Sequence, residues 1–263
     1  MAKAIFITGG GSGIGRATAE LFASKGWFVG LADVNADGMA QTAALLPTGM
    51  SSQHVMDVRH RSDWAAALTE FWAASGGRLD VLMNNAGVAR GGPFADVTPE
   101  DHDLAIDINF KGVVNGAQMG LAYLKQTPGA CLLNTCSVAG IIGAPGLATY
   151  AATKFAVRGL TESLDREWTE LGIKVRSIMP SFIDTPLLSV TVAGSNRTAR
   201  EGVSAAGLEF TPVSEVAQAA WNAVHGKKVH VLVGKTAKRL AFLQRWAPWL
   251  VDRQTKASAK SVV

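Results

Sequence analysis

Thr8-Gly9-Gly10-Gly11-Ser12-Gly13-Ile14-Gly15 follows an apolar run at residues 4–7 and precedes residues 16–21, which have a helical pattern. Glycines permit a tight turn and let backbone N–H groups approach a phosphate without obstruction by a Cβ atom. The positive end of a helix that starts near Gly13 points at the same anion. Glycine also serves ordinary turns, but this order of strand, turn and helix predicts a dinucleotide-binding segment.

The alternation that starts here continues along the chain, with short apolar runs separated by stretches of helical period. Such a pattern indicates a parallel sheet covered on both faces. Right-handed crossovers then give a doubly wound, Rossmann-like α/β sheet of about seven strands. Strands are expected at residues 4–7, 28–32, 53–56, 81–83, 130–134, 174–178 and 229–233. Helices are expected to start near Gly13, Ala36, Ser62, Asp107, Tyr150 and Val213.

Composition suggests one domain with an appendage. Of the 263 residues, 48% are hydrophobic and 17% are charged, a balance that excludes long disorder in the body of the chain. We expect a cofactor-binding and catalytic domain at residues 1–234, in which residues 186–207 form a mobile segment that covers the substrate. Residues 235–263 form a basic tail with a net charge of +6, which leaves −2 for the body. The body therefore gives no support for nucleic-acid binding.

Several features predict a soluble, cytoplasmic protein. The first ten residues lack a secretory cleavage site. The long uncharged stretch at residues 126–153 contains polar residues and glycines, which do not suit a lipid-facing helix. Cys131 and Cys136 would point to opposite faces of one strand, so a disulfide between them is not expected, and a reducing compartment fits best. No metal site is expected.

An acidic residue bears on the choice of nucleotide. Asp33 is expected at the end of the second strand, eighteen residues after Gly15. A carboxylate at this separation accepts hydrogen bonds from both ribose hydroxyls of the adenosine and repels a 2′-phosphate. Val34 and Asn35 add no cation, although Arg16 is able to reach back. NAD is therefore expected in preference to NADP, and the alternative is a solvated acid in a turn.

Tyr150 and Lys154 lie four residues apart and would share one face of a helix. A neighbouring ammonium favours the phenolate and so lowers the pKa of the tyrosine from about 10 toward the working pH. A phenol of that kind suits general acid–base catalysis. Taken singly, each residue has an ordinary alternative, a buried ring for the tyrosine and an exposed helix cation for the lysine.

Further motifs give these residues a family context. Asn84-Asn85-Ala86-Gly87 follows the fourth strand, and Ser137 precedes Tyr150 by thirteen positions. With the glycine turn and Asn109, they resemble the short-chain dehydrogenase/reductase family from residue 3 to about residue 185 and again through the last strand. The resemblance implies that Tyr150 exchanges the proton of the substrate oxygen and that Ser137 orients that oxygen. It further implies that Lys154 binds the nicotinamide ribose and that Asn109 holds a water of a proton relay.

The resemblance also implies a cofactor site and a substrate site. Ser181 stands where the family usually has glycine, which makes the local backbone harder to predict. The implied cofactor residues are Gly9, Ser12, Gly13, Ile14, Gly15, Asp33, Asp57, Val58, Asn85, Ala86, Gly87, Tyr150, Lys154, Pro180, Ile183 and Thr185. The implied substrate residues are Ser137, Val138, Leu147, Tyr150, Phe182 and Leu187. A lining with so little charge suits an apolar secondary alcohol or ketone that is bulky or cyclic.

The C-terminal tail departs from the family's commonest ending. Leu240, Leu243 and Trp246 follow a spacing of three residues, which predicts an amphipathic helix. Packing over the core or against a partner subunit is favoured over contact with a membrane surface. We expect a homodimer or homotetramer.

The resulting hypothesis is NAD-dependent hydride transfer between a secondary alcohol and its ketone. The alternatives are an NADP-dependent carbonyl or 3-oxoacyl reductase, a non-catalytic cofactor-sensing protein on the same fold, and a membrane-recruited module in which the tail carries the role.

Overall fold

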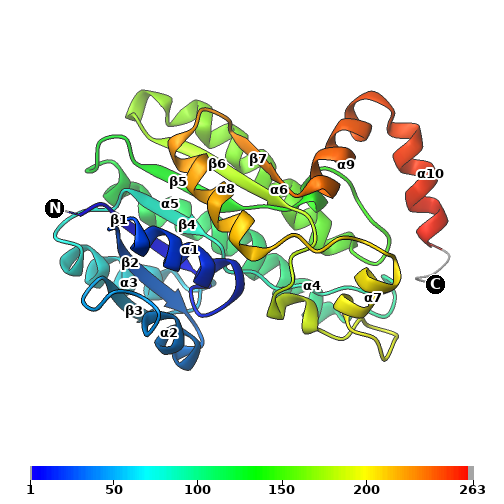
Figure 1. The fold of residues 1–263 in the computed structure, drawn as a ribbon, viewed down its shortest axis with the longest axis horizontal. Coiled ribbons are helices and arrows are strands. Elements are labelled where there is room, and N and C mark those ends of the chain that lie inside the picture. The colour runs from blue at the N-terminus through cyan, green and yellow to red at the C-terminus, as the bar shows by residue number, and fades with distance from the viewer. Residues whose placement is uncertain (1, 260–263) are drawn as a thin grey trace.

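The computed structural model describes residues 2–259, and its centre is a seven-stranded sheet in the order β3-β2-β1-β4-β5-β6-β7 (Figure 1). All neighbouring strands are parallel. The predicted doubly wound sheet is therefore confirmed. The strands are β1 (Ala4–Thr8), β2 (Phe28–Asp33), β3 (Ser51–Val55), β4 (Val81–Asn84), β5 (Cys131–Thr135), β6 (Lys174–Pro180) and β7 (His230–Val233).

Helices cover both faces of the sheet because alternate strand residues are buried on opposite sides. In β1, Ile5 and Ile7 join one core cluster, with Phe22 of α1. Phe6 joins the other, with Trp64 of α3. The helices are α1 (Gly13–Ser24), α2 (Ala36–Ala43), α3 (Arg61–Ala74), α4 (Pro99–Ile106), α5 (Gly112–Leu124), α6 (Ala148–Glu167), α7 (Ala199–Ala205), α8 (Val213–His225), α9 (Lys235–Trp246) and α10 (Pro248–Ala259). Short turns are η1 (Asp107–Lys111), η2 (Val138–Gly140), η3 (Thr169–Leu171) and η4 (Pro186–Ser189).

The expected helix start near Asp107 is wrong. The chain is already helical from Pro99, where Thr98 caps α4 by accepting a hydrogen bond from the Asp101 N–H at 3.2 Å. A threonine cap, proline in the first turn and acids behind it are themselves a helix-start signal. Asp107–Lys111 is a π-helical turn that joins α4 to α5. This turn carries Asn109, and such turns often occur at functional sites.

The tail forms two helices, α9 and α10, rather than one, because Pro248 begins a new helix. Ala237 is fully buried and Leu240 and Leu243 are partly buried, but 68% of Trp246 is exposed. The buried face of α9 therefore does not extend to Trp246 in the single chain, and packing of the tail against a partner subunit stays a prediction. With 3.6 residues per turn, positions three apart drift around the helix, and Trp246 ends opposite Ala237. Residues 260–263 of the predicted tail lie outside the described residues.

The segment after β6 is not a plain loop. Residues 186–207 contain η4 and α7, and their mobility stays a prediction. Cys131 and Cys136 are both buried, and neither forms a disulfide. None of the helices within residues 2–259 combines the length and the apolar character needed to cross a membrane.

Candidate active site

The predicted site residues gather at the carboxyl edge of the sheet, because parallel strands end on the same side. Gly9 follows β1, Asp33 ends β2, Asn85 follows β4, Ser137 follows β5 and Ser181 follows β6. They line one cavity of about 1490 Å³. That volume exceeds the roughly 300–1,000 Å³ usual for a single-ligand pocket, so the cavity has room for more than one ligand.

The turn after β1 contains backbone conformations that residues other than glycine adopt only with strain. Gly9 and Gly13 have φ of +68° and +51°, in the left-handed region. A Cβ at Gly15 would overlap the Gly9 carbonyl oxygen. Gly15 does not line the cavity but allows α1 to pack directly against the turn. Gly15 was expected among the cofactor-binding residues, but its place here is structural, whereas Gly9, Ser12, Gly13 and Ile14 face the cavity.

Asn85 uses its side chain to hold three strand ends together. Its Nδ2 donates to the Thr8 carbonyl at 2.9 Å, and its Oδ1 accepts from the Thr135 hydroxyl at 3.2 Å. The Thr8 Oγ1 in turn accepts from the backbone N–H groups of Asn85 and Ala86 at 2.9 and 3.1 Å. Asn85 lines the cavity, as predicted, but its amide positions the glycine turn against β4 and β5.

The Asp33 carboxylate is fixed at the cavity wall. Its Oδ2 accepts from the Gly11 N–H and its Oδ1 from the Asn35 N–H, both at 3.0 Å. From the sequence, Arg16 was a possible partner of this carboxylate. Its guanidinium instead donates to the Gly11 carbonyl at 2.7 Å and to the Thr42 hydroxyl at 3.0 Å. Arg16 does not line the cavity. The wall beside Asp33 is therefore acidic.

Asp57 and Val58 line the same end of the cavity. The Arg59 guanidinium lies 2.6 Å from the Asp57 carboxylate. Hydrogen bonds from Arg59 hold the pKa of Asp57 below its usual value. Arg59 also lines the cavity, and the sequence analysis did not single it out. Because this cation is paired with Asp57, its charge is largely compensated.

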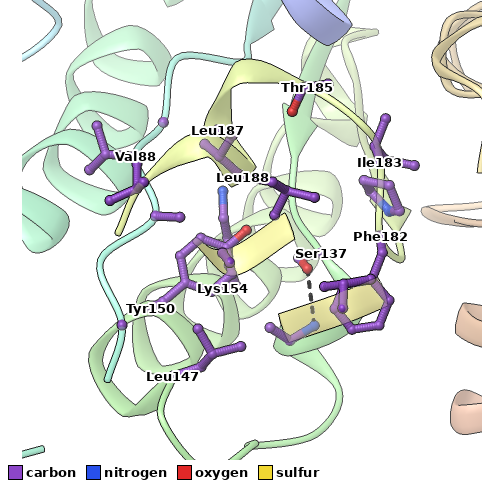
Figure 2. A pocket seen from close by; sticks show the side chains of 18 of the residues that line it. Val88, Ser137, Leu147, Tyr150, Lys154, Phe182, Ile183, Thr185, Leu187 and Leu188 are labelled. Atoms are coloured by element: carbon purple, nitrogen blue, oxygen red, sulfur yellow. Dashed lines mark hydrogen bonds between the residues drawn. The ribbon is translucent and has the colours of Figure 1, made fainter. Parts of the chain in front are cut away.

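Tyr150 and Lys154 project from adjacent turns of α6 beside Ser137 (Figure 2). The Lys154 ammonium lies 5.6 Å from the centre of the Tyr150 ring and donates to the Thr135 carbonyl at 3.0 Å. The Ser137 Oγ accepts from the Ala139 N–H at 3.1 Å. The three side chains line the cavity together, as the motif spacing predicts.

The electrostatics of this group differ from the sequence-based expectation. Desolvation raises the pKa of Tyr150 to about 12, and a hydrogen bond with Ser137 only partly opposes it. Burial also lowers the pKa of Lys154. The expected lowering of the tyrosine pKa by Lys154 is thus wrong for this structure, because the ammonium binds the Thr135 carbonyl and desolvation dominates. The Tyr150 phenol is protonated at neutral pH.

Asn109 is fully buried and does not line the cavity. Its Oδ1 accepts from the Val88 N–H at 2.8 Å, and its Nδ2 donates to the Val88 carbonyl at 2.9 Å. A Cβ built on Gly87 would lie 3.2 Å from the Asn109 Oδ1 and 3.9 Å from the Lys154 Nζ. The amide therefore fastens the chain after β4 beside Lys154. The predicted role in holding a water stays a prediction.

The segment after β6 accepts serine in place of the family's glycine without strain. Ser181 has an ordinary φ, and its N–H donates to the Val233 carbonyl at 3.2 Å. Thr185 lies close to the glycine turn, because a Cβ on Gly13 would come within 3.2 Å of the Thr185 Cβ. Pro180, Ile183 and Thr185 all line the cavity, so the backbone uncertainty raised by Ser181 is removed.

The remaining cavity wall is mostly apolar. Val138, Leu147, Phe182 and Leu187 line it as predicted, and Figure 2 shows Leu147, Leu187 and Phe182 around Tyr150 and Lys154. The sequence analysis missed a set of lining residues from the last two helices. Because β7 ends at the same edge of the sheet, the chain that follows it could have been predicted to reach the cavity. The missed residues are Thr236, Arg239, Leu240, Val251, Gln254 and Thr255.

Known proteins are similar to this chain in sequence and in fold. The family model described as short chain dehydrogenase matches residues 3–195. The chain is 36% identical to the 3-oxoacyl-acyl-carrier-protein reductase of Thermotoga maritima over 82% of its own length and 87% of the relative. It is 31% identical to the cyclopentanol dehydrogenase of a Comamonas species, covering 89% of this chain and 97% of that one. A Burkholderia phymatum short chain dehydrogenase/reductase, solved with NAD, superimposes with a TM-score of 0.82 at 27% identity, covering 95% of both chains.

Proposed function

This chain belongs to the short-chain dehydrogenase family of oxidoreductases, and we propose that it interconverts an apolar, bulky or cyclic secondary alcohol and its ketone, using NAD. The observation that carries the proposal is one cavity that holds Ser137, Tyr150 and Lys154 together with the glycine turn and Asp33. A structural tyrosine would need no such neighbours. The joint arrangement favours catalysis over a cofactor-sensing role.

The residues present fit a dinucleotide. Gly9 and Gly13 of the turn line the cavity without a side chain, and α1 begins at Gly13, so its N-terminal N–H groups suit a pyrophosphate. Asp33 suits the adenosine ribose and disfavours a 2′-phosphate. The Burkholderia phymatum relative was solved with NAD, which supports the same choice here. When bound, a nicotinamide supplies the carbon that accepts or donates the hydride.

Tyr150 is the proposed general acid and base. Its raised pKa, about 12, keeps the phenol protonated at neutral pH, so the hydroxyl is ready to give its proton to a ketone oxygen. Ser137 accepts the Ala139 N–H, and its hydroxyl also makes a hydrogen bond with Tyr150, so both hydroxyls are placed to meet the same substrate oxygen. Lys154, held by the Thr135 carbonyl, places a positive charge beside the site. We assign Asn109 the support of this lysine through the Val88 backbone.

The substrate class rests on the lining. Val138, Leu147, Phe182 and Leu187 surround the proposed reacting position and bring no charge to it. An apolar lining with a few aimed polar groups selects an apolar ligand with one polar atom. The cyclopentanol dehydrogenase relative acts, by its name, on a cyclic secondary alcohol.

A homodimer or homotetramer stays the proposed assembly, and an apolar part of the surface supports it. A second hollow of about 460 Å³ lies between α4, η1 and α6 and is lined by apolar residues such as Phe94 and Ile106. Ile106 and Phe155 are 44% and 43% exposed. Large apolar side chains gathered on one surface are typical of an interface. Sedimentation is expected to give at least a dimer.

The experiment is a panel of cyclic and linear secondary alcohols and ketones, followed by nicotinamide absorbance with both cofactors. We expect turnover of apolar substrates with NAD(H) at higher kcat/KM than with NADP(H). A 3-oxoacyl thioester with NADPH belongs in the panel, since the Thermotoga maritima relative is named for that reaction. A strong NADPH preference contradicts the nucleotide assignment. The absence of turnover across the whole panel would contradict the proposal.

A further inference from the structure

We propose that the hairpin of α9 and α10, residues 235–259, forms the outer wall of the substrate site and binds the distal part of an extended apolar substrate. The inference rests on the proposed function and deepens it, because it names the length of substrate that the site accepts. Two independent lines support it: the strand order, and the burial and lining of the hairpin itself.

The strand order places the hairpin on the same side of the sheet as Ser137 and far from the proposed adenosine position. In the order β3-β2-β1-β4-β5-β6-β7, Asp33 and Asp57 lie at one side of the sheet edge, after β2 and β3. Ser137 follows β5, and the hairpin follows β7 at the opposite side. A ligand that starts at the catalytic serine and runs away from the cofactor therefore approaches the hairpin.

The hairpin is anchored where it leaves the sheet. Gly234 has φ of +89°, and a Cβ there would overlap the Thr211 hydroxyl, so this position needs glycine. Lys235 pairs with Glu209 at 3.7 Å. Ala237 of α9 is fully buried, and α9 packs against β7 and against η2, which begins directly after Ser137. The start of the hairpin is thus tied to the catalytic part of the chain.

The inner side of the hairpin is part of the cavity. Leu240 of α9 and Val251 of α10 line the cavity that contains Tyr150, and only 3% of Val251 is exposed. Val203 of α7 and Leu208 line it as well. Figure 1 shows α7, α9 and α10 at the same end of the molecule. These four apolar side chains offer contacts to hydrocarbon. The same hairpin adds polar groups to the lining, namely those of Thr236, Arg239, Gln254 and Thr255.

The outer side of the same helix provides the contrast. Phe242, two residues from Leu240, is 63% exposed and does not line the cavity. Leu240 is partly buried and does line it. The same substitution at these two positions therefore separates an effect on the cavity from an effect on the helix.

The test is the NADH-dependent reduction of a series of 2-alkanones from butanone to 2-decanone. In the wild type, kcat/KM is expected to rise by about fourfold for each methylene that enters the apolar wall. Leu240→Trp fills that space and is expected to lower kcat/KM for 2-decanone by about tenfold or more while changing butanone by less than about threefold. Phe242→Trp is expected to leave the whole series unchanged.

The controls keep the outcomes distinct. NADH affinity, measured by fluorescence, should be unchanged in Leu240→Trp, which shows that the cofactor end is intact. Should that variant fail to fold, Leu240→Ala is the second probe, with a smaller gain per methylene expected.

An equal loss for short and long ketones in the Leu240 variants, or no loss for either, overturns the assignment of the hairpin. If the wild type reduces cyclic ketones but no ketone of this series with NADH, the assignment of the hairpin is likewise overturned; if it reduces neither, the proposed function fails instead.

Discussion

The two ends of the cavity are held by different kinds of contact. At the cofactor end, formed by residues 8–15, Asp33 and residues 85–87, side chains such as Asn85 and Asp33 bind backbone atoms at 2.9–3.0 Å. At the proposed substrate end, formed by η4, α7 and the α9–α10 hairpin, apolar side chains such as Leu187, Leu240 and Val251 come from segments far apart in the chain. The first end constrains the sequence position by position, whereas the second constrains only size and polarity.

This difference predicts how each end tolerates change. A close-packed backbone turn is expected to lose cofactor affinity when a single methyl group is added, because there is no free space to accommodate it. An apolar wall accepts substitutions of similar volume and changes selectivity rather than chemistry. The predictions below test that comparison, beginning with the group at which the two ends meet.

Tyr150→Phe removes the proposed general acid, the hydroxyl that lies between the cofactor end and the substrate end. We expect kcat to fall by about a thousandfold or more, because a general acid contributes up to about 10⁴-fold, with NADH affinity unchanged within about threefold. Steady-state assays and fluorescence titration measure the two quantities. Tyr123→Phe is the matched control, since the chain has two tyrosines and the Tyr123 hydroxyl contacts Thr69. Equal losses in both variants would sink the assignment.

Gly15→Ala compared with Gly202→Ala tests the contrast directly. The added methyl group overlaps the Gly9 carbonyl oxygen in the first variant and meets nothing within 4 Å in the second. Overpacking costs about 1–3 kcal/mol, so NADH affinity should fall by about tenfold or more in Gly15→Ala. The affinity of Gly202→Ala should stay within about twofold. Similar affinities in the two variants would show that the cofactor end is no more rigid than the substrate end.

These glycines also show how much the sequence predicted. Local sequence patterns contain the glycine turn, Asp33, Ser137, Tyr150 and Lys154. Each pattern follows a strand that is recognisable from its apolar run. The strand order and the shared cavity then follow from right-handed crossovers. Local patterns were therefore enough for the fold and for bringing these residues to one cavity, although they did not indicate Arg59.

The rest of the site depended on information that no local pattern carries. Leu240 and Val251 lie about a hundred residues from Tyr150, and their contact with the cavity depends on the path of the chain after Gly234. The pKa of Tyr150 depends on how far its hydroxyl is desolvated and on which acceptor binds Lys154. Spacing along a helix fixes neither.

Asp33→Asn tests the preference of the cofactor end for NADH over NADPH. The amide oxygen preserves one acceptor for the Gly11 N–H but removes the charge that repels a 2′-phosphate. We expect the NADH-to-NADPH ratio of kcat/KM to fall by about tenfold. Asp37→Asn removes the same charge four residues along, at an exposed position outside the cavity lining, and should change the ratio by less than about twofold. An unchanged ratio in Asp33→Asn argues against Asp33 as the selector.

The pH dependence should differ between the two directions of the reaction. Because burial raises the pKa of Tyr150 to about 12, the protonated phenol needed for ketone reduction persists through neutral pH. Alcohol oxidation needs the phenolate, so its rate should rise by about tenfold per pH unit below the apparent pKa of the complex. Reduction should stay flat and decline only at alkaline pH. Stopped-flow rates at saturating cofactor measure both, and opposite slopes would contradict the role of Tyr150.

The most direct measurement is a crystal structure of the protein with NADH and an unreactive ketone analogue. The account predicts the adenosine ribose against Asp33 and the Tyr150 hydroxyl within hydrogen-bond distance of the analogue's oxygen, beside the nicotinamide. A well-ordered complex in which that hydroxyl faces away from the analogue would contradict the account.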